Sequence, residues 1–277
     1  MNVLLQSASA RHPAARAGAG PAVRGASLQV AAGEQVAIIG PSGAGKTTLL
    51  QLLACALPPS AGALQLDGRS PWELPRAELQ RLRGRLFLAP QVPPLPPRQR
   101  VVTAVLAGRL PAMGAWQSLR SLFYPADIPA AHAALDRFDL ADKLFDRVDR
   151  LSGGERQRVG LTRALLSPAS LWLIDEPLSA LDPARASQAI DTLRSAAHER
   201  GATLVATLHQ VDVALAHFPR IVGLRDGGVA FDLPAAQVGR ERLAALYAQH
   251  EDELTGPAHR MEDVAPAAPQ PAVMHCR

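Results

Sequence analysis

Cysteine is scarce in this sequence, with two residues among 277. Cys55 falls within the apolar pattern of a predicted helix, and Cys276 lies next to the last residue. The pair has neither the spacing of a metal site nor that of a disulfide framework. We therefore expect a protein of a reducing compartment whose fold is held by an apolar core.

Long apolar runs are also missing. The best stretch, residues 101–119, is interrupted by Arg109 and Pro111 and falls short of the 18 or so apolar residues that a membrane span needs. The N-terminus lacks the charged-then-apolar pattern of a signal peptide. We expect a soluble chain that acts at a membrane only through partners.

Aromatic residues make up 4% of the chain, and no basic run with interleaved aromatics is present. The net charge of +4 is mild, so we expect no nucleic-acid partner. Hydrophobic residues account for 48% of the chain, enough for a sizeable core. From Thr255 onward proline and alanine dominate without periodicity, which predicts one domain at 1–254 and a disordered tail at 255–277.

A glycine-rich turn lies between an apolar strand, residues 36–39, and a helix that starts near Lys46. Gly40, Gly45, Lys46 and Thr47 match the phosphate-binding loop G-x-x-x-x-G-K-[ST]. The whole loop comprises Gly40, Pro41, Ser42, Gly43, Ala44, Gly45, Lys46, Thr47 and Thr48. The alternative is a chance match in a turn, which the strand before it and the helix after it disfavour.

Each residue type in this loop has a chemical reason. Glycines let successive backbone N–H groups face phosphate oxygens, and the helix N-terminus adds partial positive charge. We expect Lys46 to reach the β- and γ-phosphates and the Thr47 hydroxyl to bind Mg²⁺. The loop therefore predicts a nucleoside triphosphate with Mg²⁺ as ligands.

Strands alternate with helices along the rest of the chain, which predicts an α/β core with a mostly parallel sheet. Strands are expected at 3–6, 27–30, 36–39, 63–66, 86–88, 171–174, 203–208, 221–224 and 228–232, the last two as a closing hairpin. Helices are expected from 46 and at 77–83, 155–166, 184–201, 211–217 and 241–250. The proline-broken helical pattern at about 92–150 predicts an inserted all-α lobe.

Two carboxylates, Asp175 and Glu176, follow the apolar strand at 171–174. In phosphate-loop ATPases the first such carboxylate holds Mg²⁺, and an adjacent Glu can polarise the attacking water. A solvated acidic turn is the alternative for this pair taken alone. Downstream of a phosphate loop, the magnesium and water roles are favoured.

A second anion-binding helix start is predicted at Ser152-Gly153-Gly154. One nucleotide does not need two such sites in one subunit, whereas two subunits that face head to tail would use both. At this point the sequence resembles the ATP-binding subunits of ABC transporters, whose signature motif is LSGGQ. Glu155 stands at the position of the glutamine.

The resemblance covers about residues 2–250 and implies further roles. Gln91 is similar to the glutamine that senses Mg²⁺ and water and contacts the membrane partner. Asp182 is similar to the aspartate that crosses the dimer interface. His209 is similar to the switch histidine that holds the γ-phosphate and the water. The resemblance also implies an antiparallel β segment near the N-terminus, next to the phosphate-loop core.

Two departures from the family pattern stand out. The family usually places an aromatic residue near the N-terminus against the adenine ring, and His12 occupies the corresponding place here. We expect His12 to stack instead. Trp172 is bulky for a central strand, so its indole N–H should find a partner or reach an edge.

The helical lobe is similar to that of phosphonate importer ATPases at residues 105–110, 116, 118–119, 122–123 and 140–143. Outside the lobe, residues 208–212 and 224–227 are similar to the same group. The resemblance implies a second copy of the chain, permease subunits, a periplasmic or extracellular binding protein and a place at the cytoplasmic face of the membrane. A phosphate or amino-acid importer and a lipoprotein exporter remain alternatives. Soluble ABC ATPases of DNA repair or translation are disfavoured, because the chain has neither a coiled-coil insertion nor a second ATPase domain.

The resemblance also implies a mechanism. Two copies would sandwich two ATP molecules, each between a phosphate loop and the other copy's Ser152-Gly153-Gly154. Glu176 would orient or deprotonate the water. His209 and Lys46 would stabilise the charge on the transferring phosphoryl group.

Overall fold

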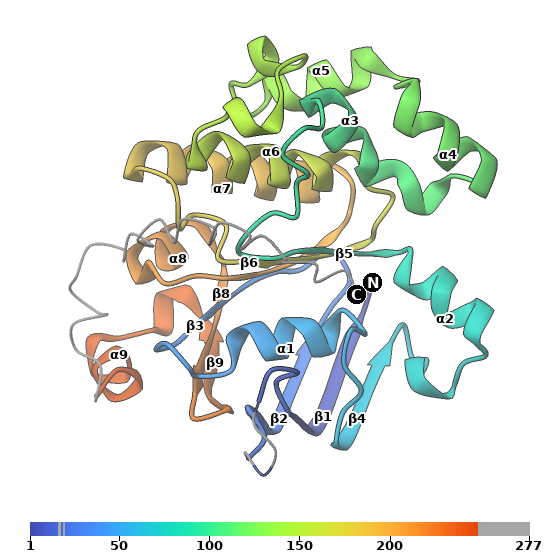
Figure 1. Cartoon of the computed structure of the whole chain (residues 1–277). Coiled ribbons are helices and arrows are strands. Elements are labelled where there is room, and N and C mark those ends of the chain that lie inside the picture. The colour runs from blue at the N-terminus through green and yellow to red at the C-terminus, as the bar shows by residue number, and fades with distance from the viewer. Residues whose placement is uncertain (16–17, 19, 249–277) are drawn as a thin grey trace, which may run out of the picture.

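A computed structural model describes residues 1–15, 18 and 20–248 of the protein (Figure 1). The predicted tail at 255–277, Cys276 and the last residues of the helix expected at 241–250 lie outside the described residues. In Figure 1 a layer of helices lies above a large sheet, and a smaller sheet lies below it. The chain thus has the layered α/β architecture that its strand and helix pattern predicts.

The large sheet has six strands in the order β5-β6-β7-β3-β8-β9. Its strands are β3 Gln35–Ile39, β5 Leu86–Ala89, β6 Leu171–Asp175, β7 Thr203–Thr207, β8 Arg220–Arg225 and β9 Gly228–Pro234. Strands β5 to β8 and β3 run parallel, and β9 pairs antiparallel with β8. The mostly parallel sheet and its closing hairpin are therefore as the sequence predicts.

The small sheet is antiparallel, with the order β2-β1-β4. It comprises β1 Val3–Ala10, β2 Val23–Val30 and β4 Ala61–Leu66. The first two strands are longer than the predicted 3–6 and 27–30, because register shifts in β1 let pairing continue past Ser7. Register irregularities of this kind leave little trace in a pattern of alternating apolar residues.

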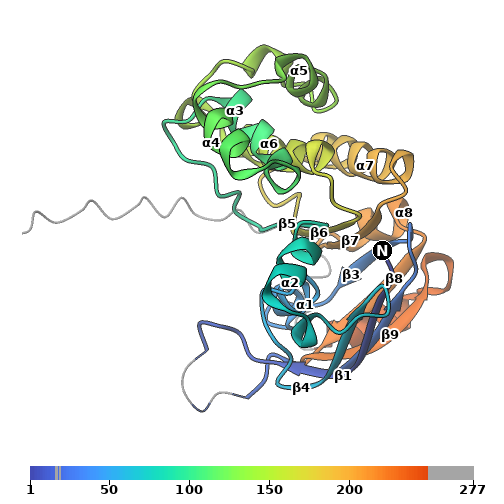
Figure 2. The same cartoon turned by 90° about the vertical axis from the view of Figure 1, so that its right-hand side faces the viewer.

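The helices fall into two groups around the large sheet. They are α1 Lys46–Leu53, α2 Arg76–Arg83, α3 Val101–Leu106, α4 Ala115–Phe123, α5 Ile128–Asp136, α6 Gly153–Leu166, α7 Pro183–Glu199, α8 Val211–His217 and α9 Arg240–Leu246. Short 3₁₀ turns occur at Pro71–Glu73, Ala107–Ala112, Ala141–Lys143, Val148–Arg150 and Ala235–Gln237. Figure 2 shows α3 to α6 gathered on the side of the sheet opposite to α1.

Successive side chains of a strand point to opposite faces of the sheet, so each strand of the large sheet contributes to two separate apolar cores. Trp172 and Ile174 of β6 join the apolar cluster under α6 and α7, whereas Leu171 and Leu173 join the cluster around α1 and the small sheet. The Trp172 indole Nε1–H donates to the Ala169 carbonyl oxygen at 3.1 Å. The predicted need of this N–H for a partner is thus confirmed.

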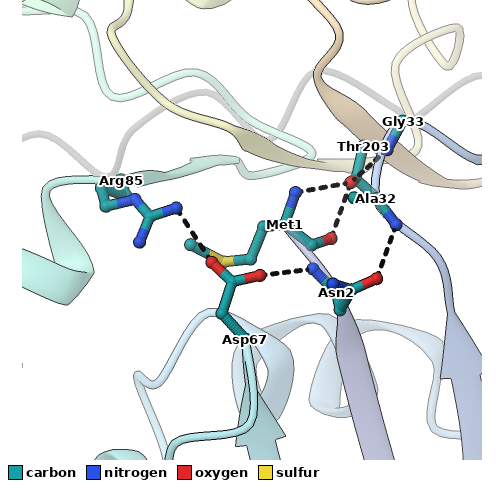
Figure 3. Close-up of polar contacts among 7 residues, drawn as sticks. All are labelled: Met1, Asn2, Ala32, Gly33, Asp67, Arg85 and Thr203. Atoms are coloured by element: carbon teal, nitrogen blue, oxygen red, sulfur yellow. Dashed lines mark hydrogen bonds and ion pairs between the residues drawn. The ribbon is translucent and has the colours of Figure 1, made fainter.

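Hydrogen bonds at the amino end of β7 join the two sheets (Figure 3). The buried Thr203 hydroxyl donates to the Met1 carbonyl oxygen at 2.8 Å and accepts the Gly33 N–H at 3.0 Å. Asp67 accepts the Asn2 N–H at 2.8 Å and pairs with Arg85 at 2.9 Å. The small sheet is therefore tied to the edge of the large sheet that lies away from the strands' carboxyl ends.

Candidate active site

Four neighbouring strands of the large sheet present their carboxyl ends at one edge. The phosphate loop follows β3, Glu176 follows β6, His209 follows β7 and Gln91 follows β5. Ligands of open α/β sheets bind at this edge, outside the carboxyl ends of the strands. Residues that are far apart in the sequence therefore meet here.

The phosphate loop has a backbone that only glycine adopts without strain. Gly40, Gly43 and Gly45 have φ values of 154°, 77° and 99°. A Cβ on Gly40 would lie 2.1 Å from the Leu224 carbonyl oxygen, and one on Gly45 would lie 2.3 Å from that of Ala22. The glycines thus let the loop wind tightly in front of α1.

Lys46 is buried and its ammonium group lies over this loop. Its Nζ donates to the carbonyl oxygens of Gly40 at 2.7 Å and Pro41 at 3.2 Å. A hollow of about 100 Å³ adjoins the loop; it is lined by Pro41, Ser42, Gly43, Ala44, Arg225, Asp226 and Leu246. The loop thus combines a cation, a helix N-terminus and backbone N–H groups, which suits a phosphate chain.

Asp175 is buried at the end of β6. Burial raises the pKa of its carboxyl group, and hydrogen bonds with the side chains of Thr207 and Thr47 act in the opposite direction. The Thr207 hydroxyl donates to Asp175 Oδ1 at 2.7 Å. Thr47 and Asp175 together supply hydroxyl and carboxylate oxygens, the hard donors that suit Mg²⁺ when phosphates and water complete its shell.

Glu176 has both carboxylate oxygens engaged. Gln91 Nε2 donates to Oε2 at 2.7 Å, and His209 Nε2 lies 2.5 Å from Oε1. Glu176 is mostly buried, with 12% of its side chain exposed, while His209 is 34% exposed. The three residues that the sequence proposed separately therefore form one cluster beside Asp175.

Ser152 caps the N-terminus of α6. Its hydroxyl accepts the Glu155 N–H at 3.2 Å, and the Ser152 N–H donates to Glu155 Oε2 at 2.8 Å. That backbone hydrogen bond is the main reason that the pKa of Glu155 is lowered. The glutamate at the signature position of this motif thus completes a capping box and starts the helix at Gly153, two residues before the predicted start.

Ser152, Gly153 and Gly154 are not brought to the phosphate loop of the same chain. Helix α6 lies on the apolar cluster of one face of the sheet, and α1 lies on the cluster of the other face (Figure 1). A Cβ on Gly154 would lie 3.0 Å from the Ala180 carbonyl oxygen. Gly154 therefore packs against the loop before α7, whereas Gly153 is exposed.

Asp182 and His12 form polar contacts with residues close to them in the sequence. Asp182 is the N-cap of α7: its Oδ1 accepts the Arg185 N–H at 3.0 Å, and its side chain is 55% exposed. His12 follows β1, and its Nδ1 accepts the Ala14 N–H at 3.2 Å. The described residues place no aromatic partner on the imidazole, so its stacking role stays a prediction.

Two further groups of polar contacts were missed from the sequence. Thr207 contacts both residues of the acidic pair. Ser187 Oγ lies 3.1 Å from His217 Nε2, and His217 Nδ1 lies 2.8 Å from Asp191 Oδ1. In the sequence, Thr207 is one more β-branched residue of a strand, and Ser187 and Asp191 are polar residues of an amphipathic helix.

Comparison with known proteins adds to this geometry. A family model described as "ABC transporter" matches residues 23–179. The chain is 72% identical over 277 residues, all of both chains, to "Phosphonates import ATP-binding protein PhnC" of Polaromonas sp.. It is 56% identical over 248 residues, 90% of both chains, to "Phosphonates import ATP-binding protein PhnC 1" of Pseudomonas aeruginosa.

A solved structure is also similar. It is described as the dimeric post-hydrolysis state of an ATP-binding cassette bound to ADP and Pi. Its TM-score is 0.71 at 27% identity, over 84% of this chain and 98% of that one. In the part of our chain that the structure describes, no helix is long and apolar enough to cross a bilayer.

Proposed function

The chain belongs to the ABC transporter family, and we propose that it is the ATP-hydrolysing subunit of a phosphonate importer. The observation that carries the proposal is the 72% identity to a phosphonate import ATP-binding protein over the full length of both chains. The cluster of Gln91, Glu176 and His209 supports the proposal, because it gathers the three side chains to which water and phosphate roles are proposed.

The phosphate loop is the proposed ATP site. Gly40 to Thr48 would surround the phosphates with backbone N–H groups, and Lys46 would exchange its two carbonyl partners for β- and γ-phosphate oxygens. Thr47, Asp175 and Gln91 would hold Mg²⁺, with Gln91 released from Glu176 to do so. Bound Mg²⁺ would neutralise the charge that develops on the phosphates.

Glu176 is the proposed general base. Its mostly buried carboxylate lies between Gln91 and His209, and water held by Oε1 or Oε2 would be aligned for in-line attack. His209 would then contact the γ-phosphate, and with Lys46 it would stabilise the negative charge of the transition state. The proposed roles of Gln91 and His209 need their direct contacts with Glu176 to open when ATP binds.

The site is proposed to be shared by two copies of the chain. Because Ser152, Gly153 and Gly154 lie on the other side of the sheet from α1, a second copy is the source that could bring this helix N-terminus to the ATP. The exposed Asp182 would contact the partner copy, and the dimeric state of the similar cassette supports this assembly. His12 is proposed to stack on adenine from the loop after β1.

Permease subunits and a periplasmic or extracellular binding protein are the further proposed partners, with the chain peripheral on the cytoplasmic face of the membrane. The lobe at about 92–150, inside a domain at 1–254, is the proposed permease contact. A hollow of about 540 Å³ opens there, lined by Arg98, Gln99, Arg100, Val102, Thr103, Pro125 and Phe145. It lies on the segment that leads on from Gln91, which links such a contact to the site.

The test is ATP hydrolysis by the chain purified with its permease and reconstituted in vesicles with the binding protein. We expect alkylphosphonates to stimulate hydrolysis and to accumulate inside the vesicles. If inorganic phosphate or amino acids stimulate hydrolysis and alkylphosphonates do not, the chain would serve an importer of those substrates instead. Outward movement of a lipoprotein would replace import, and failure of the chain to bind a permease would exclude the transporter role.

A further inference from the structure

Thr207 is the last residue of β7 and is completely buried between the two strands that lead into the site. It pairs with Asp175 of β6 on one side and with Ile38 of β3 on the other. Its hydroxyl donates to Asp175 Oδ1 at 2.7 Å and accepts the backbone N–H of Glu176 at 3.0 Å. One hydroxyl group therefore holds both members of the acidic pair.

The bond to Glu176 fixes an unfavourable backbone conformation. Glu176 has a φ of 47°, in the left-handed region that non-glycine residues rarely adopt. Such a residue persists only where its surroundings determine its conformation. The Thr207 oxygen supplies that restraint at the Glu176 N–H, and the resulting backbone direction aims the carboxylate at Gln91 and His209.

A hydroxyl is well suited to this position. It has one donor for the Asp175 carboxylate and acceptor lone pairs for the Glu176 N–H. Valine has nearly the same shape but neither function, so it would leave the partly buried N–H of Glu176 without that partner. Serine keeps both functions on a smaller side chain.

We propose that Thr207 is a positioning residue for ATP hydrolysis, which sets Asp175 and Glu176 relative to each other. The inference rests on the proposed function, in which Glu176 is the general base. Thr207 acts through these two residues and is not assigned a contact with ATP. Its loss should therefore affect turnover more than nucleotide binding.

Thr203 offers a matched control in the same strand. It is also completely buried, and its hydroxyl likewise both donates and accepts, but at the opposite end of β7: it donates to the Met1 carbonyl oxygen and accepts from the Met1 ammonium group and the Gly33 N–H (Figure 3). Thr203→Val and Thr207→Val remove the same atoms from the same strand. Both should lower the midpoint of denaturation, so stability alone cannot distinguish them.

The experiment compares Thr207→Val, Thr207→Ser and Thr203→Val in the full chain. Steady-state ATP hydrolysis gives kcat and KM, and titration with a fluorescent ATP analogue, with and without Mg²⁺, gives nucleotide affinity. We expect Thr207→Val to lower kcat roughly 10- to 100-fold, as losses of residues that orient metal ligands do. Its nucleotide affinity without Mg²⁺ should be unchanged, and the gain in affinity on adding Mg²⁺ should be reduced.

Thr207→Ser should recover most of kcat, and Thr203→Val should keep the kcat of the unsubstituted chain. An unchanged kcat in Thr207→Val, or an equal loss in Thr203→Val, would overturn the positioning role. If the unsubstituted chain hydrolyses no ATP, the proposed function itself fails, and this inference fails with it.

Discussion

Gln91 and Glu176 stand 85 positions apart in the sequence, yet Gln91 Nε2 donates to Glu176 Oε2 at 2.7 Å. With His209 at Oε1, this bond occupies both oxygens of the proposed base. Each oxygen keeps a further acceptor site for water, but Gln91 and His209 can reach Mg²⁺ and the γ-phosphate only after their contacts with Glu176 open. The described arrangement is therefore a restrained form of the site, and closure around ATP is the event that would release it.

Glu176→Gln should abolish turnover while ATP binding persists. The amide keeps the shape of the side chain but cannot accept a proton, and loss of general-base catalysis typically costs about 10²- to 10⁴-fold in rate. Phosphate release and equilibrium ATP binding measure the two effects. Glu199→Gln, on an exposed residue paired with Arg137, is the control. Undiminished hydrolysis in Glu176→Gln would remove Glu176 from the mechanism.

Lys46→Ala should weaken nucleotide binding itself. The substitution removes the buried ammonium that lies over the loop at Gly40 and Pro41, and hydrogen bonds to charged groups contribute about 1.5–3 kcal/mol. Titration should therefore show an affinity loss of at least about tenfold. Lys143→Ala, at a lysine paired with Asp142, should bind as the unsubstituted chain does. Equal affinities for both variants would contradict the assignment.

Gly160→Ala should destabilise the protein and disturb the segment after Gln91. A Cβ on this α6 glycine would lie 2.7 Å from both Cβ and Cγ of Pro93, a rigid ring that cannot rotate away. Overpacking of this kind costs about 1–3 kcal/mol. Denaturant unfolding should show that loss together with reduced ATP hydrolysis. Gly114→Ala, where a Cβ meets nothing within 4 Å, is the control, and equal stability of the two variants would refute the contact.

Cys55 should make stability fall at alkaline pH. Burial raises the pKa of its thiol from 9.0 to about 11, so the folded state keeps a proton that the unfolded state loses. The stabilisation that the protonated thiol gives the folded state is complete below pH 9. As pH rises towards 11, the free energy of unfolding falls, by at most about 2.7 kcal/mol in total. Denaturant unfolding at several pH values measures it. In a Cys276→Ser background, Cys55→Ala should flatten this slope, and an unchanged slope would contradict the shift.

Much of the fold follows from local patterns. The parallel strands are continuous apolar runs such as Leu171 to Ile174, and the phosphate loop and the acidic pair follow such runs directly. Helix α8 spans Val211–His217, as its pattern predicts. Structural features that depend on a few neighbouring residues can therefore be predicted from the sequence.

Contacts between elements that are distant in the sequence cannot be predicted in the same way. Thr207 looks like an ordinary strand residue until β6 and β7 pair and place its hydroxyl against Asp175. The contact of Ser187 with His217 depends on how α7 meets α8. Cys55 was predicted inside a helix, but α1 ends at Leu53 and Cys55 has a φ of 55°. Sequence patterns carry no direct signal for such tertiary outcomes.

In the proposed dimer, each ATP is hydrolysed by residues of two copies of the chain. Mixing two inactive variants, Lys46→Ala and Gly153→Asp, tests this shared site. A Cβ at Gly153 meets nothing within 4 Å, and an acidic residue is tolerated at a helix start while it repels phosphate.

In a dimer of one copy of each variant, one ATP site contains both substitutions and the other site contains neither. We expect ATP hydrolysis, absent from each variant alone, to return when the two are mixed. Hydrolysis that stays absent, in a mixture shown by cross-linking to contain mixed dimers, would contradict the shared site.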